Sequence, residues 1–267
     1  MGNFFGGYTA SALRSVVVVL ILLPIAIVYR QLEPLNLKRN WRYLAGMIVA
    51  SFFVWGPLYY AILHAGIGIS LSINYASIVI GTFFFAWLLA REHLTKDKLV
   101  SAALGIVGLC LIFAHSINGI GWLALLAATM SGASIALVMV ITKLLPYNTT
   151  QTTLALWTTS IIANTIMAVV FQEARPLIGW HMPWFYLVIF AIASIIASWS
   201  FVGGVKRIEA GAAGILGLME IVFGVLFGIF LFNERPSTIV ILGVLTVIVA
   251  AAVPYVRDYN SQKGTLN

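Results

Sequence analysis

The chain has 267 residues, of which 61% are hydrophobic and 9% charged, and its mean hydropathy is +1.03. A soluble domain carries about 25% charged residues, so this composition excludes a soluble globular protein and indicates an integral membrane protein. The formal net charge is +7, but the basic residues stand singly or in small groups between apolar runs, which argues against a phosphate-binding face and a nucleic-acid partner.

Long apolar runs separated by short polar breaks predict membrane-spanning helices, because the alternating pattern of barrel strands is absent. The sequence predicts nine spans, in chain order 9–29, 41–63, 67–90, 99–114, 121–141, 152–171, 183–205, 211–232 and 238–256. The first has a continuous apolar core of only signal-peptide length, but no small-residue cleavage site follows it, so it is kept as a span.

The basic residues predict the orientation of these spans. Twelve of the fifteen lysines and arginines lie on one side, and the other side has only Arg14, Arg175 and Arg235. Because cytoplasmic loops carry the excess of positive charge, we expect the C-terminus in the cytoplasm and the N-terminus outside. An odd number of spans leads us to expect one further upstream helix, which would make ten spans with both termini inside.

The span 211–232 carries a carboxyl near its middle, at Glu220, whereas the other acidic residues lie in or beside polar breaks. At 100° per residue, four glycines fall with Glu220 within one third of the helix circumference: Gly214, Gly217, Gly224 and Gly228. Such a stripe lets another helix approach closely or leaves a cavity beside the carboxyl. An ionisable group at membrane depth is costly, so Glu220 is a candidate functional residue, the alternative being a protonated structural contact.

Two segments of the chain share one pattern, since residues 61–92 align without a gap on residues 203–234. Each segment crosses a Gly/Ala-rich turn, runs an apolar helix and exits at a glutamate, Glu92 or Glu234. Small residues recur nine and sixteen places past each glutamate: Ser101 and Gly108, Gly243 and Ala250. Five-helix halves would place the two copies in opposite orientation, the arrangement of inverted-repeat transporters.

The chain resembles EamA-type members of the drug/metabolite transporter superfamily in three stretches, TASALRSVVVVLILLPIAIVYR, FFFAWLLAREHLTKDKLVSAALGIVGL and GLMEIVFGVLFGIFLFNERPSTIVILG. The resemblance covers nearly the whole chain and implies an all-α polytopic membrane protein with ten helices in two inverted repeats around a central cavity. It implies a first repeat at 1–115 that lacks its first helix, a second repeat at 121–257 and a cytoplasmic tail at 258–267. Residues 219–224 are similar to members that export amino acids such as threonine and homoserine.

Polar residues deep in the spans are candidates for substrate binding, because transporter sites lie near the midplane at the repeat interface. Asn74 and Tyr75 could hydrogen-bond a polar substrate or Glu220 itself. Hydrogen bonding between helices, worth about 0.6 kcal/mol in a membrane, explains them equally well.

Four further residues deep in the spans are candidates: Trp199, Ser198, Ser134 and Asn164. An aromatic wall with nearby hydroxyls suits a small amphipathic solute, although a deep tryptophan is at least as often a packing residue. Asn164 is a buried amide that leaves the same two interpretations open.

Motifs for other kinds of chemistry are missing from the sequence. The four histidines have no metal-ligand spacing, and the single cysteine, Cys110, excludes an internal disulfide and a CxxC metal site. The chain has no Walker loop, nucleophile elbow or clustered carboxylate pair, so we expect no enzyme, no cofactor and no metal.

These observations predict a secondary transporter that exports small metabolites such as amino acids by alternating access. Glu220 would couple a proton, bind the substrate's amino group or only polarise the cavity. The other hypothesis is a non-transporting fragment or accessory subunit that needs a partner helix. The expected partners are a small-molecule substrate and the lipid bilayer of a bacterial inner (plasma) membrane, and a homodimer is left open.

Overall fold

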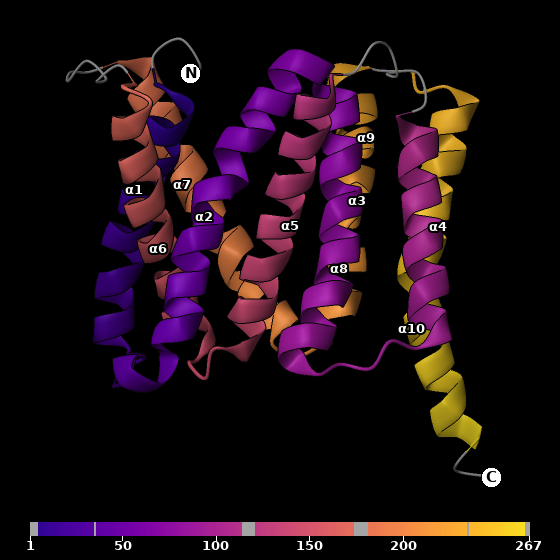
Figure 1. Ribbon diagram of the computed structural model, residues 1–267, viewed down its shortest axis with the longest axis horizontal. Helices are drawn as coiled ribbons and strands as arrows, with labels where there is room; N and C mark the ends of the chain where they lie inside the picture. Colours follow the sequence, from indigo (N-terminus) through magenta and orange to yellow (C-terminus); the bar gives the residue numbers. More distant parts are fainter. Residues whose placement is uncertain (1–4, 35, 114–120, 174–180, 234, 265–267) are drawn as a thin grey trace. The chain divides into compact units, whose positions relative to one another are not determined.

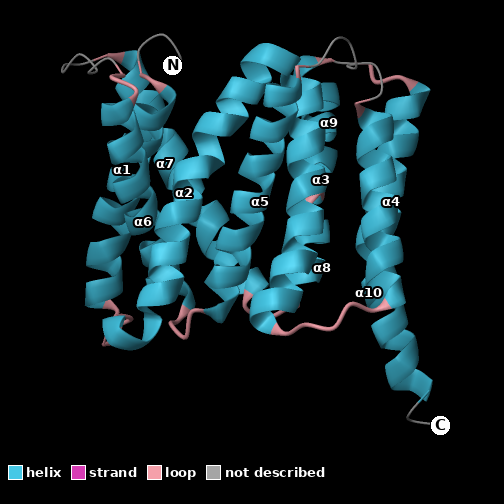
Figure 2. Ribbon diagram, in the orientation of Figure 1, coloured by secondary structure: helices cyan, strands magenta, loops and turns pink. Residues whose placement is uncertain are grey.

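A computed structural model describes residues 5–34, 36–113, 121–173, 181–233 and 235–264. These residues are nearly all helical and include no strand (Figures 1 and 2). The elements are α1 (Gly7–Val28), α2 (Leu37–Ala65), α3 (Ile67–Phe85), the π-helical turn η1 (Ala86–Ala90), α4 (Lys96–Ile112), α5 (Trp122–Leu144), α6 (Thr149–Val170), α7 (Met182–Val205), α8 (Ala210–Gly217), α9 (Met219–Phe232) and α10 (Thr238–Gly264). The predicted all-α class is confirmed. Arg175 and Glu234 lie outside the described residues.

Each of the nine predicted spans corresponds to helix in the structure. Seven spans are long and apolar enough to cross a membrane by length and composition, including α3 with η1 and α8 with α9. Two others are shorter, namely α4 with 17 residues and the apolar part of α10, Thr238–Val253. The polytopic membrane architecture therefore follows from helix length and apolarity.

Several helices begin before their predicted spans, because the spans were placed by hydropathy, which does not include a polar first turn. Helix α2 begins at Leu37 rather than residue 41, and α6 begins at Thr149 rather than residue 152. At α6 the side chain of Asn148 accepts a hydrogen bond from the backbone N–H of Gln151 at 2.9 Å. This N-cap satisfies a donor that the first helical turn leaves unpaired.

The chain forms two compact units, each made of one segment from either half of the sequence. Unit 1 comprises Met1–Tyr59 and Leu137–Arg207, and unit 2 comprises Tyr60–Ala136 and Ile208–Asn267. Helices α1, α6 and α7 therefore belong to unit 1, whereas α3, α4, α8, α9 and α10 belong to unit 2.

In unit 1, α1 and α6 lie side by side in opposite directions. Near the start of α1, Tyr8 stacks on Phe171, which follows the end of α6, with ring centroids 5.4 Å apart. Near the other end of the pair, Leu22 of α1 packs on Leu154 of α6. The apolar contact along the pair supplies most of its stability, since helix propensity alone contributes little.

The same pair of helices is held at both ends by polar contacts. The carboxylate of Glu173 accepts hydrogen bonds from Tyr8 N at 3.0 Å, Thr9 N at 2.6 Å and Thr9 Oγ1 at 2.7 Å. At the opposite end, Gln31 Oε1 accepts a hydrogen bond from Thr150 Oγ1 at 2.5 Å. Residues just past the end of each helix therefore stabilise the start of its neighbour.

In unit 2, α4 and α10 pack closely through four small residues (Figure 1). A Cβ added at Gly108 would lie 2.9 Å from the carbonyl oxygen of Gly243, and one added at Gly243 would lie 2.8 Å from that of Gly108. Ser101 Oγ donates a hydrogen bond to the carbonyl oxygen of Ala250. The small residues let the two backbones approach in the way that membrane helices favour.

Candidate functional site

The candidate site is organised around a break in the span that carries Glu220. The sequence predicted one continuous span over 211–232, but the structure divides it into α8 and α9 at Leu218. Leu218 N donates to Ile215 O at 3.0 Å and Ile221 N donates to Leu218 O at 3.1 Å, so the bonds here span three residues rather than four. Glycine lowers helix propensity, and Gly217 directly precedes the break. Irregular backbone within a span is typical of transporter binding sites.

Glu220 lies in the first turn of α9, directly after the break. Its side chain is exposed in the structure, and the phenol of Tyr75 in α3 lies close enough to interact with its carboxyl. The positive end of the α9 dipole favours a negative charge at this position. The proximity of Tyr75 and Glu220 makes these two predicted residues a candidate pair.

The glycine stripe beside Glu220 has two parts that differ in their surroundings. A Cβ added at Gly214 would lie 2.1 Å from Thr82 Oγ1, so α3 approaches α8 closely at this level. A Cβ added at Gly217 or Gly224 would meet no heavy atom within 4 Å. The stripe is thus packed against α3 at Gly214 and meets no neighbouring heavy atom at Gly217 and Gly224.

Asn74 differs from its neighbour Tyr75 in its contacts, because it is buried against α5. It is 2% exposed, and its Nδ2 donates to Ser131 Oγ at 2.9 Å and to the carbonyl oxygen of Ala128 at 3.3 Å. Gly132 lies against the same position, since a Cβ there would come within 2.2 Å of the Asn74 carbonyl oxygen. Asn74 therefore joins α3 to α5, whereas Tyr75 is the residue of α3 that lies near Glu220.

Comparison with known proteins identifies the family. The model of the EamA-like transporter family matches residues 1–114 and 121–255. The chain belongs to the EamA-like transporter family. It is thus an integral membrane protein of a family whose members are membrane transporters of small molecules rather than enzymes.

The fold of this EamA-like protein has a counterpart among solved structures. A structure described only as "Crystal structure of protein" is 16% identical in sequence, with a TM-score of 0.75 over 93% of this chain and 86% of the other. At this identity the likeness shows the fold alone. No curated protein matches the chain.

The other predicted site residues of this EamA-like protein divide between the two units. Ser134, in unit 2, donates its hydroxyl to the carbonyl oxygen of Met130 at 2.8 Å, so it is satisfied within its own helix. Trp199, in unit 1, is 49% exposed and donates from Nε1 to Thr150 Oγ1 at 3.1 Å. Ser198 accepts from Trp157 Nε1 at 2.9 Å.

Asn164 lies in a polar cluster between α1 and α6. Its Nδ2 donates to Ser160 O at 2.8 Å and Ser160 Oγ at 2.9 Å, and Ser160 Oγ is 3.1 Å from Ser15 Oγ. Asn164 is 1% exposed, and its Oδ1 has no hydrogen-bond partner among the described residues. Of the seven predicted residues, Tyr75 and Glu220 are the two that the structure brings close enough to interact with each other among the contacts it describes.

A charged residue that sequence analysis did not select lies close to this cluster along α1. Arg14 is 7% exposed although it stands inside an apolar helix. In the sequence, Arg14 was counted only among the three basic residues on the non-cytoplasmic side. Its place as the sixth residue of the predicted span 9–29 was the signal that could have identified it.

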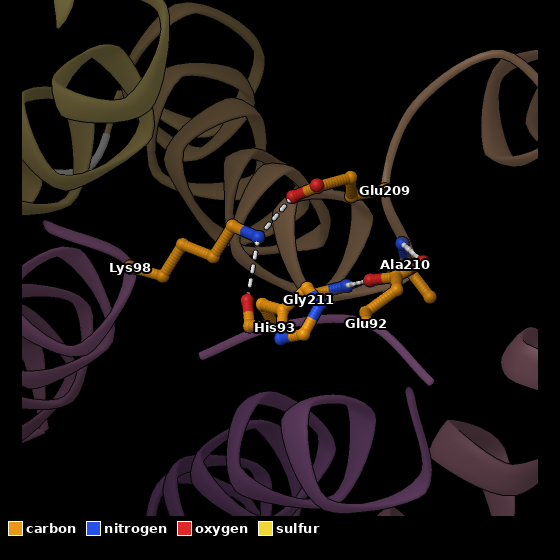
Figure 3. A network of polar contacts seen from close by, with 6 residues as sticks. All are labelled: Glu92, His93, Lys98, Glu209, Ala210 and Gly211. Atoms are coloured by element: carbon orange, nitrogen blue, oxygen red, sulfur yellow. Dashed lines mark hydrogen bonds and ion pairs between the residues drawn. The ribbon is translucent and has the colours of Figure 1, made fainter. Parts of the chain in front are cut away.

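A polar network connects the end of η1 to the start of α8 (Figure 3). The carboxylate of Glu92 accepts hydrogen bonds from Ala210 N at 2.9 Å and Gly211 N at 3.4 Å. Lys98 Nζ forms an ion pair with Glu209 and donates to the carbonyl oxygen of His93 at 2.9 Å. Glu92 thereby caps the N-terminus of the half-helix α8.

Proposed function

We propose that this protein is a secondary transporter of small metabolites such as amino acids, in which Glu220 carries the coupling proton. One observation supports this proposal above the others: a carboxyl in the first turn after a helix break, with the phenol of Tyr75 nearby and open space at Gly217 and Gly224. A carboxyl that served only as a structural contact would be enclosed by its neighbours, whereas the side chain of Glu220 is exposed.

The chemistry of this site suits exchange of a proton or an ammonium group. An ionised carboxylate offers about four lone-pair positions, and the nearby Tyr75 hydroxyl could fill at most one of them. The rest are available to a proton, water or the amino group of a substrate. Protonation removes the charge, which lowers the cost of exposing the group to an apolar surface during a change of conformation. Loading and release of a proton would thereby be linked to the movement of substrate.

We further propose that the protein alternates between two conformations of two inverted repeats, residues 1–115 and 121–257, with 258–267 as a cytoplasmic tail. The family match in two segments supports this division. The α4–α10 contact supports it too, because Ser101 meets Ala250 and Gly108 meets Gly243. The small residue nine places past the glutamate in one half thus contacts the one sixteen places past the glutamate in the other, as expected for two copies that run in opposite directions. The distribution of basic residues supports a cytoplasmic C-terminus. The similarity of residues 219–224 to exporters of amino acids is the basis for proposing export across a bacterial inner membrane.

Flux measurements in proteoliposomes test the role of Glu220. A panel of amino acids is offered with and without a pH gradient to wild type, Glu220→Gln and Glu209→Gln. The first variant keeps the shape of the side chain and removes its titration. The second removes a carboxyl that lies 51% exposed in the Lys98 ion pair, a kind of contact worth at most about 1 kcal/mol.

The expected result is a response to the gradient in wild type and Glu209→Gln, and no response in Glu220→Gln. An equal response in Glu220→Gln would contradict the proton role and leave transport standing. No flux of any solute in wild type would contradict transport by this chain alone and would favour the accessory-subunit hypothesis.

A further inference from the structure

Arg14 occupies an unusual position for a permanent charge. It is the eighth residue of α1, which places it about 10 Å along the helix axis at 1.5 Å per residue. Its side chain is 7% exposed. A guanidinium stays protonated in proteins, so unlike a carboxyl it cannot avoid the cost of burial by becoming neutral.

Three aromatic rings from three different helices surround the guanidinium. The Arg14 Cζ atom lies 5.2 Å from the ring centroid of Trp55 in α2, 5.2 Å from that of Trp157 in α6 and 4.6 Å from that of Phe190 in α7. The faces of these rings attract a cation electrostatically. They do not replace the lone pairs that the N–H groups of arginine require.

The guanidinium lacks a counter-ion among the described residues. Its Nε is buried without a hydrogen-bond partner, and the ion pair described in the structure joins Lys98 to Glu209 and does not involve Arg14. The carboxylate of Glu173 at the start of α1 is already engaged by Tyr8 and Thr9. A buried charge without a partner in an apolar span is a functional-site candidate.

We propose that Arg14 binds the carboxylate of the transported solute. This inference rests on the proposed transport function and names the class of solute: small molecules with one carboxylate and an apolar or aromatic body. The N–H groups of arginine form a rigid fork that matches a carboxylate in two parallel hydrogen bonds. The rings of Trp55, Trp157 and Phe190 supply an apolar wall beside that fork.

A carboxylate fits this site better than a phosphate group. One guanidinium neutralises the single charge of a carboxylate, whereas a phosphate monoester carries close to two charges at neutral pH and would leave an excess inside the span. No second lysine or arginine contacts the ring cluster in the contacts that the structure describes. The experiment must therefore distinguish a carboxylate from a phosphate group, whether that phosphate belongs to a free solute or to a lipid headgroup.

The three rings differ in how easily a solute could replace them. Trp157 is 9% exposed and is held by its hydrogen bond to Ser198. Phe190 is 51% exposed and has no polar atom to fix it. The edge of the cluster at Phe190 is thus the side where a carboxylate reaches the guanidinium with the least disturbance of packing.

The experiment compares amino acids with their amides, which differ only in the carboxylate, in proteoliposomes containing the full chain. Wild type is expected to carry the acids at least about tenfold faster than the amides, because a buried polar group left unpaired by the amide discriminates strongly. Arg14→Met is expected to lose that preference while still carrying the amide. Arg14→Lys is expected to keep the preference with KM raised several-fold, since an ammonium is a point charge without the fork. Arg207→Met, which removes an exposed arginine, is the matched control.

Several outcomes would overturn the inference. Equal flux of acids and amides in wild type, or an unchanged preference in Arg14→Met, contradicts it and leaves transport intact. Loss of both solutes in Arg14→Met with a folded protein assigns Arg14 to holding helices together. Inhibition by inorganic phosphate but not by acetate assigns the site to phosphate. If Arg14→Met does not fold, an unchanged KM in Arg14→Lys overturns it. No flux of either solute in wild type contradicts transport itself.

Discussion

Glu220 and Arg14 both stand inside apolar helices, but the structure surrounds them in opposite ways. Glu220 lies at a helix break with an exposed side chain and the phenol of Tyr75 nearby. Arg14 lies within a continuous helix, 7% exposed, among three aromatic rings. The carboxyl of Glu220, which can gain or lose a proton, is thus exposed, whereas the permanently charged guanidinium of Arg14 is buried.

This difference separates two tasks that a transporter of charged solutes must perform. A group that couples protons must reach water and must be able to lose its charge at modest cost. A group that recognises an anion gains strength from a dry environment, because electrostatic interactions are stronger where water is excluded. The open carboxyl and the enclosed guanidinium fit these two requirements.

The largest effect on transport is expected from the substitution Tyr75→Phe, which changes the surroundings of Glu220. Tyr75→Phe removes the phenol hydroxyl next to the Glu220 carboxyl. A hydrogen bond to a charged group contributes about 1.5–3 kcal/mol, so gradient-driven flux should fall about tenfold if this hydroxyl binds the carboxylate during transport. Flux with and without a pH gradient measures it. Asn74→Ala is the control: it should lower the thermal unfolding midpoint in detergent and leave the response to the gradient in place. If Asn74→Ala lost more of the response to the pH gradient than Tyr75→Phe, Asn74 rather than Tyr75 would be the partner of Glu220 in transport.

A smaller effect is expected from two alanine substitutions in α8 that compare its packed and open positions. Gly214→Ala places a Cβ against Thr82, which is fully buried and bonded to Val79 O at 2.8 Å, so it should destabilise the protein by about 1–3 kcal/mol. Gly217→Ala meets open space and should be neutral or stabilise by about 0.5–1 kcal/mol. Thermal unfolding of both variants in detergent measures the difference. Equal destabilisation would show that the space beside Glu220 is filled.

The smallest effect is expected on the stability of Arg14→Met. Replacing a buried charge by an apolar side chain of similar length is often neutral or stabilising, so the unfolding free energy should change by less than about 1 kcal/mol or rise. The same unfolding assay measures it, with Arg207→Met as the reference. Destabilisation by several kcal/mol would mean that the guanidinium chiefly holds α1, α2, α6 and α7 together.

Local patterns in the sequence were sufficient for the architecture. The apolar runs predicted every helix that the structure places in a span, because a membrane helix satisfies its backbone within one segment and needs no distant partner. Glu220 could be selected for the same reason, since a carboxyl in an apolar run is costly wherever the helix lies. The small residues Gly108 and Gly243 were visible as a repeated pattern before their contact was known.

The partners of each side chain, by contrast, were decided by the tertiary structure. Asn74 and Tyr75 are adjacent in sequence and were predicted together, yet one is buried against α5 and the other meets Glu220. Periodicity places residues on a helix face but does not say which helix covers that face. The break at Leu218 depends on interactions on both sides of the helix, including the capping of α8 by Glu92, which lies far away in the chain.

The sequence by itself determined an all-α membrane protein with a carboxyl at depth, because these properties depend on residues within one helix. Only the tertiary structure showed Arg14 as an enclosed charge, since Trp55, Trp157 and Phe190 come from three other helices. An arginine near the start of an apolar run has the same sequence pattern whether it reaches the interface or turns inward. The environment of its charge is set by long-range packing, which no local pattern contains.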